Sequence, residues 1–129
     1  MQPKERLKTK WAQLETVVGS SKRLALVARD IVEHVELRFE AQPGKVMVVC
    51  MSRRICVELH REIARLRPAW VSDDDAAGAM KVVMTGSASD PLDWQAHVRN
   101  KPRREALADR FRDPGESLHC LMNKCDKDA

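Results

Sequence analysis

Two short runs of hydroxyl, glycine and arginine residues have the composition of phosphate-binding turns. The runs are Ser52-Arg53-Arg54 and Thr85-Gly86-Ser87, and each directly follows an apolar stretch. The first offers a hydroxyl, free amides at a helix N-terminus and two guanidinium groups, and the second adds a glycine for close approach and two hydroxyls. Such groups recognise the backbone of a nucleic acid and not its bases. The alternative is that Ser52 is an ordinary N-cap and both arginines are surface charge.

Metal-ligating residues are present, but their spacing does not favour a metal site. Cys56 and His60 are four residues apart on a predicted helix, and His119-Cys120 precedes Cys125. Neither set forms the paired knuckles of a structural zinc site. The run Asp73-Asp74-Asp75 is more typical of a solvated acidic loop than of a cation site.

The motifs of nucleotide hydrolysis and nuclease chemistry are missing. The sequence has no Gly-x-x-x-x-Gly-Lys-Ser/Thr loop, and the run from Gly19 to Lys22 lacks both its first glycine and a preceding strand. No predicted strand ends in an acidic pair for magnesium, and no nucleophilic Ser or Cys has the required context. We therefore expect no catalysis by this chain alone and no bound cofactor.

Composition limits the classes of protein to consider. The chain has 129 residues, 43% hydrophobic and 33% charged, which suits one soluble domain. No apolar run approaches the roughly 20 residues of a membrane-spanning helix. The N-terminus has no apolar signal segment, and four cysteines without secretion predict reduced thiols in a cytoplasm. Basic ends around an acidic middle (68–98) permit contact with nucleic acid, whereas 4% aromatic residues argue against a base-stacking platform.

Helical periodicity runs through the first 41 residues. Apolar residues recur every three or four positions from Leu7 to Val18, and Gly19 ends the pattern. A second helix is predicted after the serines at 20 and 21. Its apolar face is formed by Leu24, Ala28, Ile31, Val35 and Phe39. We therefore expect a helical arm over residues 1–42.

The next segment has the pattern of an α/β unit. The apolar run 45–51 predicts a strand covered on both faces, and a helix capped by Ser52 follows it as far as Pro68. A second strand is predicted over 80–84 and a short helix over 102–112. Since the connection is long enough for a crossover, we expect the two strands to be parallel neighbours. Both polar turns would then gather on one edge of the sheet.

Three long runs of the sequence occur in order in one family of proteins. They are Lys45 to Leu59, the loop from Trp70 to Asp75, and Lys81 to Pro91. They closely resemble the start of the second RecA-like motor lobe in type I restriction enzyme R subunits, and the segment from Trp11 through His34 resembles the linker between the two lobes. The resemblance covers about residues 4–114. It implies an α/β fold: a partial RecA-like (P-loop NTPase-type) parallel sheet preceded by the helical arm.

The resemblance also implies a role for the two polar turns. Such R subunits are superfamily-2 translocases that pump duplex DNA with ATP and magnesium, cut it with a separate nuclease domain, and work with methyltransferase and specificity subunits. Ser52 and Arg53 then belong to a motor motif that touches the DNA strand, and the turn at 85–87 lies at the next strand-end loop. We expect weak contacts with the backbone of duplex DNA.

The sequence departs from the family after residue 114. Residues 115–129 resemble nothing in it, so we expect an arm at 1–42, a partial motor lobe at 43–114 and a divergent, poorly ordered tail at 115–129, caused by frameshift or truncation. Without the first lobe and the nuclease domain, we expect no ATP hydrolysis and no DNA cleavage. A second class of function stays open, namely a stand-alone interaction protein that docks to a partner through residues 4–41.

Overall fold

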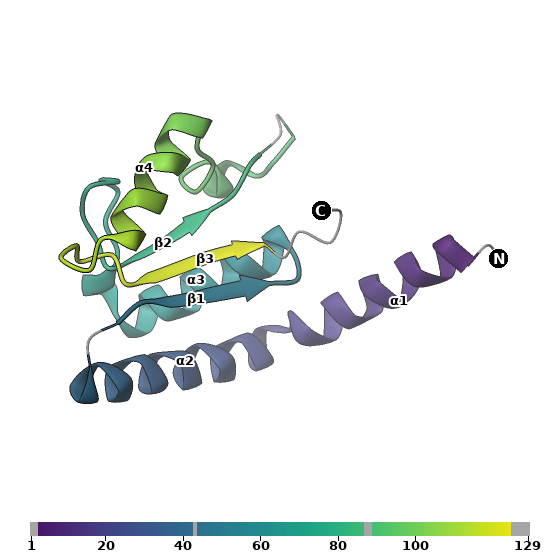
Figure 1. The fold of residues 1–129 in the computed structure, drawn as a ribbon. Coiled ribbons are helices and arrows are strands. Elements are labelled where there is room, and N and C mark those ends of the chain that lie inside the picture. The colour runs from purple at the N-terminus through teal and green to yellow at the C-terminus, as the bar shows by residue number, and fades with distance from the viewer. Residues whose placement is uncertain (1–2, 43, 87–88, 125–129) are drawn as a thin grey trace.

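Within the part of the chain that the structure describes, the protein consists of a three-stranded parallel sheet and four α-helices. The computed structural model describes residues 3–42, 44–86 and 89–124. The helices are α1 (Pro3–Val18), α2 (Ser21–Ala41), α3 (Arg53–Leu66) and α4 (Lys101–Arg112), with short 3-10 turns η1 (Pro68–Trp70) and η2 (Leu92–Trp94). The strands are β1 (Val46–Cys50), β2 (Met80–Val83) and β3 (Cys120–Lys124). The predicted α/β class with N-terminal helices is therefore confirmed (Figure 1).

The two helices of the arm differ in how much surface they bury. The α2 helix lies along the body of the protein and contacts α3, whereas α1 projects away from the sheet (Figure 1). The buried face of α2 consists of Leu24, Ala28, Val32 and Val35. Val32 therefore belongs to the buried face, whereas Ile31, which was predicted to lie on it, is only partly buried. No helix within the described ranges combines the length and apolar character that crossing a membrane requires.

The order of the strands differs from the prediction. The sheet runs β1-β3-β2, and both pairings are parallel. The expectation that residues 45–51 and 80–84 are direct neighbours is therefore wrong, because β3 lies between them. In this register Met122 of β3 pairs with Val48 on one side and with Val82 on the other.

Burial explains why the C-terminal segment is the central strand. The side chains of Leu118, Cys120 and Met122 are completely buried. A central strand satisfies its backbone groups on both sides, and a short apolar run is enough to form one. The expectation of poor order across 115–129 is thus wrong for residues 120–124, whereas residues 125–129 lie outside the described part. The three domain boundaries stay a prediction.

The two faces of the sheet are covered unequally. The α3 helix covers the face that carries Val82 and Met122, and these side chains belong to the main hydrophobic core. The other face is covered only in part: Leu121 is buried, but Met47 and Val49 of β1 are 53% and 56% exposed. The expectation that strand 45–51 is covered on both faces is therefore wrong within this chain.

Candidate functional site

The hydroxyl of Ser52 connects the start of α3 to the arm. Its Oγ accepts a hydrogen bond from the amide of Ile55 at 3.2 Å, as a helix N-cap does, and donates one to Glu15 Oε1 at 2.9 Å. The predicted capping role is confirmed. The second bond joins residues 37 positions apart in the sequence, so this hydroxyl is already engaged within the protein.

Arg54 makes a more extensive connection to the same helix. Its Nε donates to Glu15 Oε1 at 2.7 Å and its Nη1 to Glu58 Oε2 at 2.6 Å. The guanidinium also donates to the carbonyl oxygens of Glu15 and Gly19, each at 3.2 Å. These carbonyls lie at the C-terminal end of α1, where backbone acceptors lack partners within the helix. We call this group, with Ser52, the arm clasp: Glu15, Gly19, Ser52, Arg54 and Glu58.

The arm clasp depends on a glycine and on an ionised carboxylate. A Cβ atom at Gly19 would lie 2.8 Å from both the carbonyl oxygen of Glu15 and Cγ1 of Ile55, and it would collide with the guanidinium of Arg54. The hydrogen bond from Arg54 is the main reason why the pKa of Glu15 is below its usual range, although burial opposes this shift. Arg54 is therefore a structural residue of the clasp rather than a free cation.

Arg53 points in a different direction and brings the two polar turns together. Its Nη1 and Nη2 donate to the carboxylate of Asp90 at 2.6 and 3.0 Å, and Nη1 also donates to the carbonyl oxygen of Thr85 at 3.1 Å. The guanidinium lies over the ring of Trp94, 5.3 Å from its centre. The predicted meeting of the two strand-end turns thus occurs through this side chain, although β1 and β2 are not adjacent.

The second turn approaches its own chain closely. A Cβ atom at Gly86 would lie 2.6 Å from Val98 Cγ2 and 2.9 Å from Asp90 Oδ2. A glycine is needed here because the neighbouring segment of the protein fills the space. Thr85 and Gly86 are exposed, and Ser87 lies outside the described residues.

A cavity of about 410 Å³ opens beside Arg53 at the ends of β2 and β3. It is lined by Arg53, Val83, Met84, Thr85, Arg104, Leu121 and Asn123. Two of its polar atoms, Nε of Arg104 and Oδ1 of Asn123, are buried and have no hydrogen-bond partner within the described residues. A buried donor and acceptor without partners are costly, so this cavity has unused capacity for a polar ligand. We call it the strand-end cavity.

Neither Arg104 nor Asn123 was among the residues predicted from the sequence. Arg104 precedes Leu107 by three positions, so the two side chains share one face of α4. Leu107 is completely buried, and this spacing was the signal that could have identified Arg104. Asn123 could not have been found in this way, because it lies in the segment expected to be poorly ordered.

The acidic loop pairs with arginine side chains and does not form an open cation site within the described residues. The carboxylate of Asp75 accepts hydrogen bonds from Nε of Arg99 at 3.1 Å and from Nε of Arg103 at 2.9 Å. These bonds, that of Arg103 above all, lower the pKa of Asp75, while burial opposes the shift. Among the described residues, no three His, Cys, Asp or Glu side chains are grouped as a metal site would require.

The cysteine and histidine expected on one helix have separate partners. The thiol of Cys56 is hydrogen-bonded with that of Cys50, and this bond and burial raise the pKa of Cys56. The ring of His60 instead packs edge-on against His97, with 4.7 Å between ring centres. The two side chains therefore do not act together as ligands.

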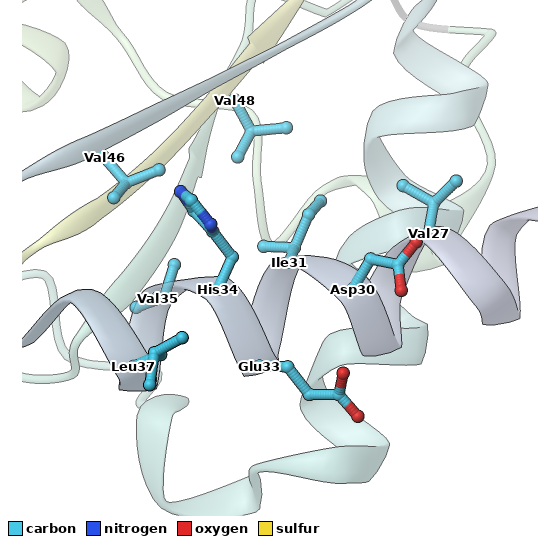
Figure 2. Close-up of a pocket in the computed structure, with 9 residues that line it drawn as sticks. All are labelled: Val27, Asp30, Ile31, Glu33, His34, Val35, Leu37, Val46 and Val48. Carbon is cyan, nitrogen blue, oxygen red and sulfur yellow. The ribbon is translucent and has the colours of Figure 1, made fainter.

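A wider cavity, of about 550 Å³, lies between α2 and β1 and contains none of the predicted site residues (Figure 2). Apolar side chains of both elements line it, with Asp30, Glu33 and His34 among them. On α1, Leu14 is exposed and Trp11 is half-buried. Docking to a partner through the arm stays a prediction, which sedimentation can test.

Comparison with known proteins gives two relatives, both much longer than this chain. Over 108 residues it is 43% identical to the type I restriction enzyme HindI endonuclease subunit of Haemophilus influenzae, covering 84% of this chain and 10% of the relative. Over 120 residues it is 36% identical to a protein of Methanocaldococcus jannaschii assigned as the type I restriction enzyme MjaIXP endonuclease subunit, covering 92% and 11%. The chain thus spans about a tenth of the length of these curated relatives. No family model matches it, and no solved structure does.

Proposed function

Because the chain is a homologue of one segment of the type I restriction enzyme endonuclease subunits, we propose that it forms part of the DNA-translocating motor of such a subunit. In this proposal the segment is the start of the second RecA-like lobe and contributes contacts with the DNA backbone. It acts in the cytoplasm with the methyltransferase and specificity subunits. ATP and magnesium serve the whole subunit, and since this sequence has no phosphate loop, we assign it no step of hydrolysis or cleavage.

The proposal is supported above all by the unused guanidinium of Arg104 in the strand-end cavity. No ion pair or side-chain hydrogen bond engages it within the described residues, and its Nε is buried without a partner. Arg53 and Thr85 line the same cavity. A guanidinium and a hydroxyl suit the oxygens of a phosphodiester. The cavity lies beyond the carboxyl ends of the strands, where open α/β sheets bind ligands.

The six residues predicted from the sequence have different parts in this proposal. Arg53 is neutralised by Asp90, so it supplies hydrogen bonds and positions Thr85 but adds little net charge. Gly86 lets this turn pack tightly against Val98. Ser52 and Arg54 act indirectly, because they hold the arm against the turn that carries Arg53. Ser87 remains a proposed contact, although it lies outside the described residues.

Salt-dependent DNA binding tests the proposal. We expect the chain to bind a short duplex weakly. The logarithm of the binding constant should fall linearly with the logarithm of the salt concentration. Arg104→Ala should weaken binding about tenfold at low salt and reduce the slope by about one ion, as loss of one phosphate contact does. Fluorescence anisotropy of a labelled duplex measures both quantities, and changing the base sequence of the duplex should have no effect.

A matched control lies on the same helix. Arg112 is 74% exposed and pairs with Asp109 one turn away, so Arg112→Ala removes the same charge without touching the strand-end cavity. Equal losses of affinity in the two variants would show that only overall charge matters, and the proposed site would then be wrong. Binding unchanged in Arg104→Ala would exclude it as well.

A further inference from the structure

A second polar cavity lies on the other side of β2, between α3, the acidic loop and the segment before α4. Its volume is about 340 Å³, and its charged and titratable lining residues are His60, Asp73, Lys81, His97, Arg99 and Arg103. None of them lines the strand-end cavity. We call it the β2-edge cavity.

Lys81 carries a buried positive charge that no ion pair within the described residues neutralises. The whole residue is only 2% exposed. The ammonium donates to the carbonyl oxygens of Ser72 at 2.5 Å and Asp74 at 2.8 Å, and no ion pair to it occurs among the described residues. Burial is costly for an ammonium group and is the main reason why the pKa of Lys81 is lowered. The charges of Arg99 and Arg110 lower it further, while the carboxylates of Asp75 and Asp74 oppose the shift. An anion in the cavity would relieve this cost.

Two arginines at the same cavity share a single carboxylate. Arg99, which is 7% exposed, donates to Asp75 Oδ1 and also to the carbonyl oxygens of Val82 and His97. Arg103 donates to the same Asp75 carboxylate. The two guanidinium groups thus share the carboxylate of Asp75, and Lys81 has no ion-pair partner of its own among the described residues, although the carboxylate of Asp73 also lines the cavity.

Two histidines line the cavity, and burial and nearby positive groups lower the pKa of each. Burial first, then the ring of His97 and the charges of Lys81 and Arg99, lower the pKa of His60 to about 4. Burial and the charges of Arg99 and Lys81 likewise lower the pKa of His97. The other groups that act on the pair are Arg61 and the carboxylate of Asp93, which opposes the shift at His97. Both imidazoles are thus neutral at neutral pH and can donate or accept hydrogen bonds.

From these contacts we infer that the β2-edge cavity binds a phosphate-type oxyanion, through Lys81 and Arg103 with the two imidazoles beside them. A buried ammonium, an arginine at the mouth and neutral imidazoles that can donate through their N–H groups form a suitable donor set. The oxyanion is either free phosphate or a phosphate group of a nucleic acid backbone, since both present the same oxygens. This site is independent of the DNA contacts proposed at the strand-end cavity.

Nuclear magnetic resonance of the histidine side chains tests the inference on the full chain. Inorganic phosphate is added in a phosphate-free buffer, with sodium chloride at equal ionic strength as the reference. We expect saturable shifts of the His60 and His97 signals. Because a nearby dianion stabilises the imidazolium form, the midpoint of the His60 titration should rise by about one pH unit.

Substitutions separate this site from general charge effects. Lys81→Met keeps the buried hydrocarbon stem and should abolish the saturable shifts. Arg103→Gln should weaken phosphate binding about tenfold, as loss of a charge-assisted hydrogen bond does. Lys101→Gln removes an equal charge from a side chain that is 77% exposed, two positions away on α4, and should leave binding unchanged. The comparison of Arg103→Gln with Lys101→Gln still tests the site even if circular dichroism shows that Lys81→Met does not fold.

A competition experiment with DNA distinguishes free phosphate from a nucleic acid backbone as the natural ligand. If a short duplex displaces phosphate from the β2-edge cavity, the natural ligand is a nucleic acid backbone; if it does not, the ligand is a small phosphate. Either result supports the site, and Arg104→Ala should not affect phosphate binding. Non-saturable shifts, or equal effects of Arg103→Gln and Lys101→Gln, would overturn the inference.

Discussion

Replacing Met122 by alanine tests whether β3 is the central strand of the core. This side chain is completely buried, and its residue pairs with Val48 and Val82. Removing a fully buried methionine side chain costs about 2–5 kcal/mol, of which about 1.5–3 kcal/mol is lost transfer free energy and the rest is the cavity left behind. We expect the free energy of unfolding to fall by about 3 kcal/mol, a large part of the roughly 5–15 kcal/mol that stabilises a domain.

Met47 provides a control of the same residue type in the same sheet. It lies on β1 and is 53% exposed, so Met47→Ala should cost about 1 kcal/mol or less. Urea unfolding followed by circular dichroism measures both variants, and equal slopes would show that only stability has changed. Equal losses in the two variants, or a loss below about 1 kcal/mol for Met122→Ala, would refute the placement of β3 in the core.

Three further predictions concern the arm, the acidic loop and the core thiols. Gly19→Ala should raise hydrogen exchange throughout α1, because the added Cβ would lie 2.8 Å from the Glu15 carbonyl oxygen and displace Arg54; unchanged exchange would contradict the arm clasp. The pKa of Asp75 is lowered in the folded state, so its stabilising effect is present above its ordinary pKa of 3.8 and is lost as the pH falls through the lower folded value. Asp75→Asn should therefore flatten the acid side of a stability–pH curve measured by urea unfolding, and a curve identical to wild type would exclude this role. Burial raises the pKa of Cys120 to about 11, so peptide mapping after iodoacetamide treatment near neutral pH should find this thiol unmodified until urea unfolds the chain.

Local patterns were sufficient for much of the fold. Glycine and proline marked the ends of the helices correctly, since α1 ends before Gly19 and α3 ends before Pro68. The apolar runs at 46–50 and 80–83 are strands, and Ser52 caps α3 as predicted. These features depend on neighbouring residues, so a single sequence contains the information needed to predict them.

Long-range pairing could not be predicted in the same way. Strand β3 was missed because its apolar run is short and charged residues follow it, and only its two partners make it a central strand. The clasp between Glu15 and Arg54 joins residues 39 positions apart, and no local pattern indicates it. The neutralisation of Arg53 by Asp90 was not foreseen for the same reason, because these residues are 37 positions apart.

The three consecutive residues at 52–54 divide their contacts between two directions. Ser52 and Arg54 grip the end of α1, while Arg53 reaches the carbonyl of Thr85. These contacts therefore join the end of α1 to the turn at Thr85 through a single turn of helix. A displacement of α1 that preserved its contacts with Ser52 and Arg54 would also act on Arg53, which lines the strand-end cavity.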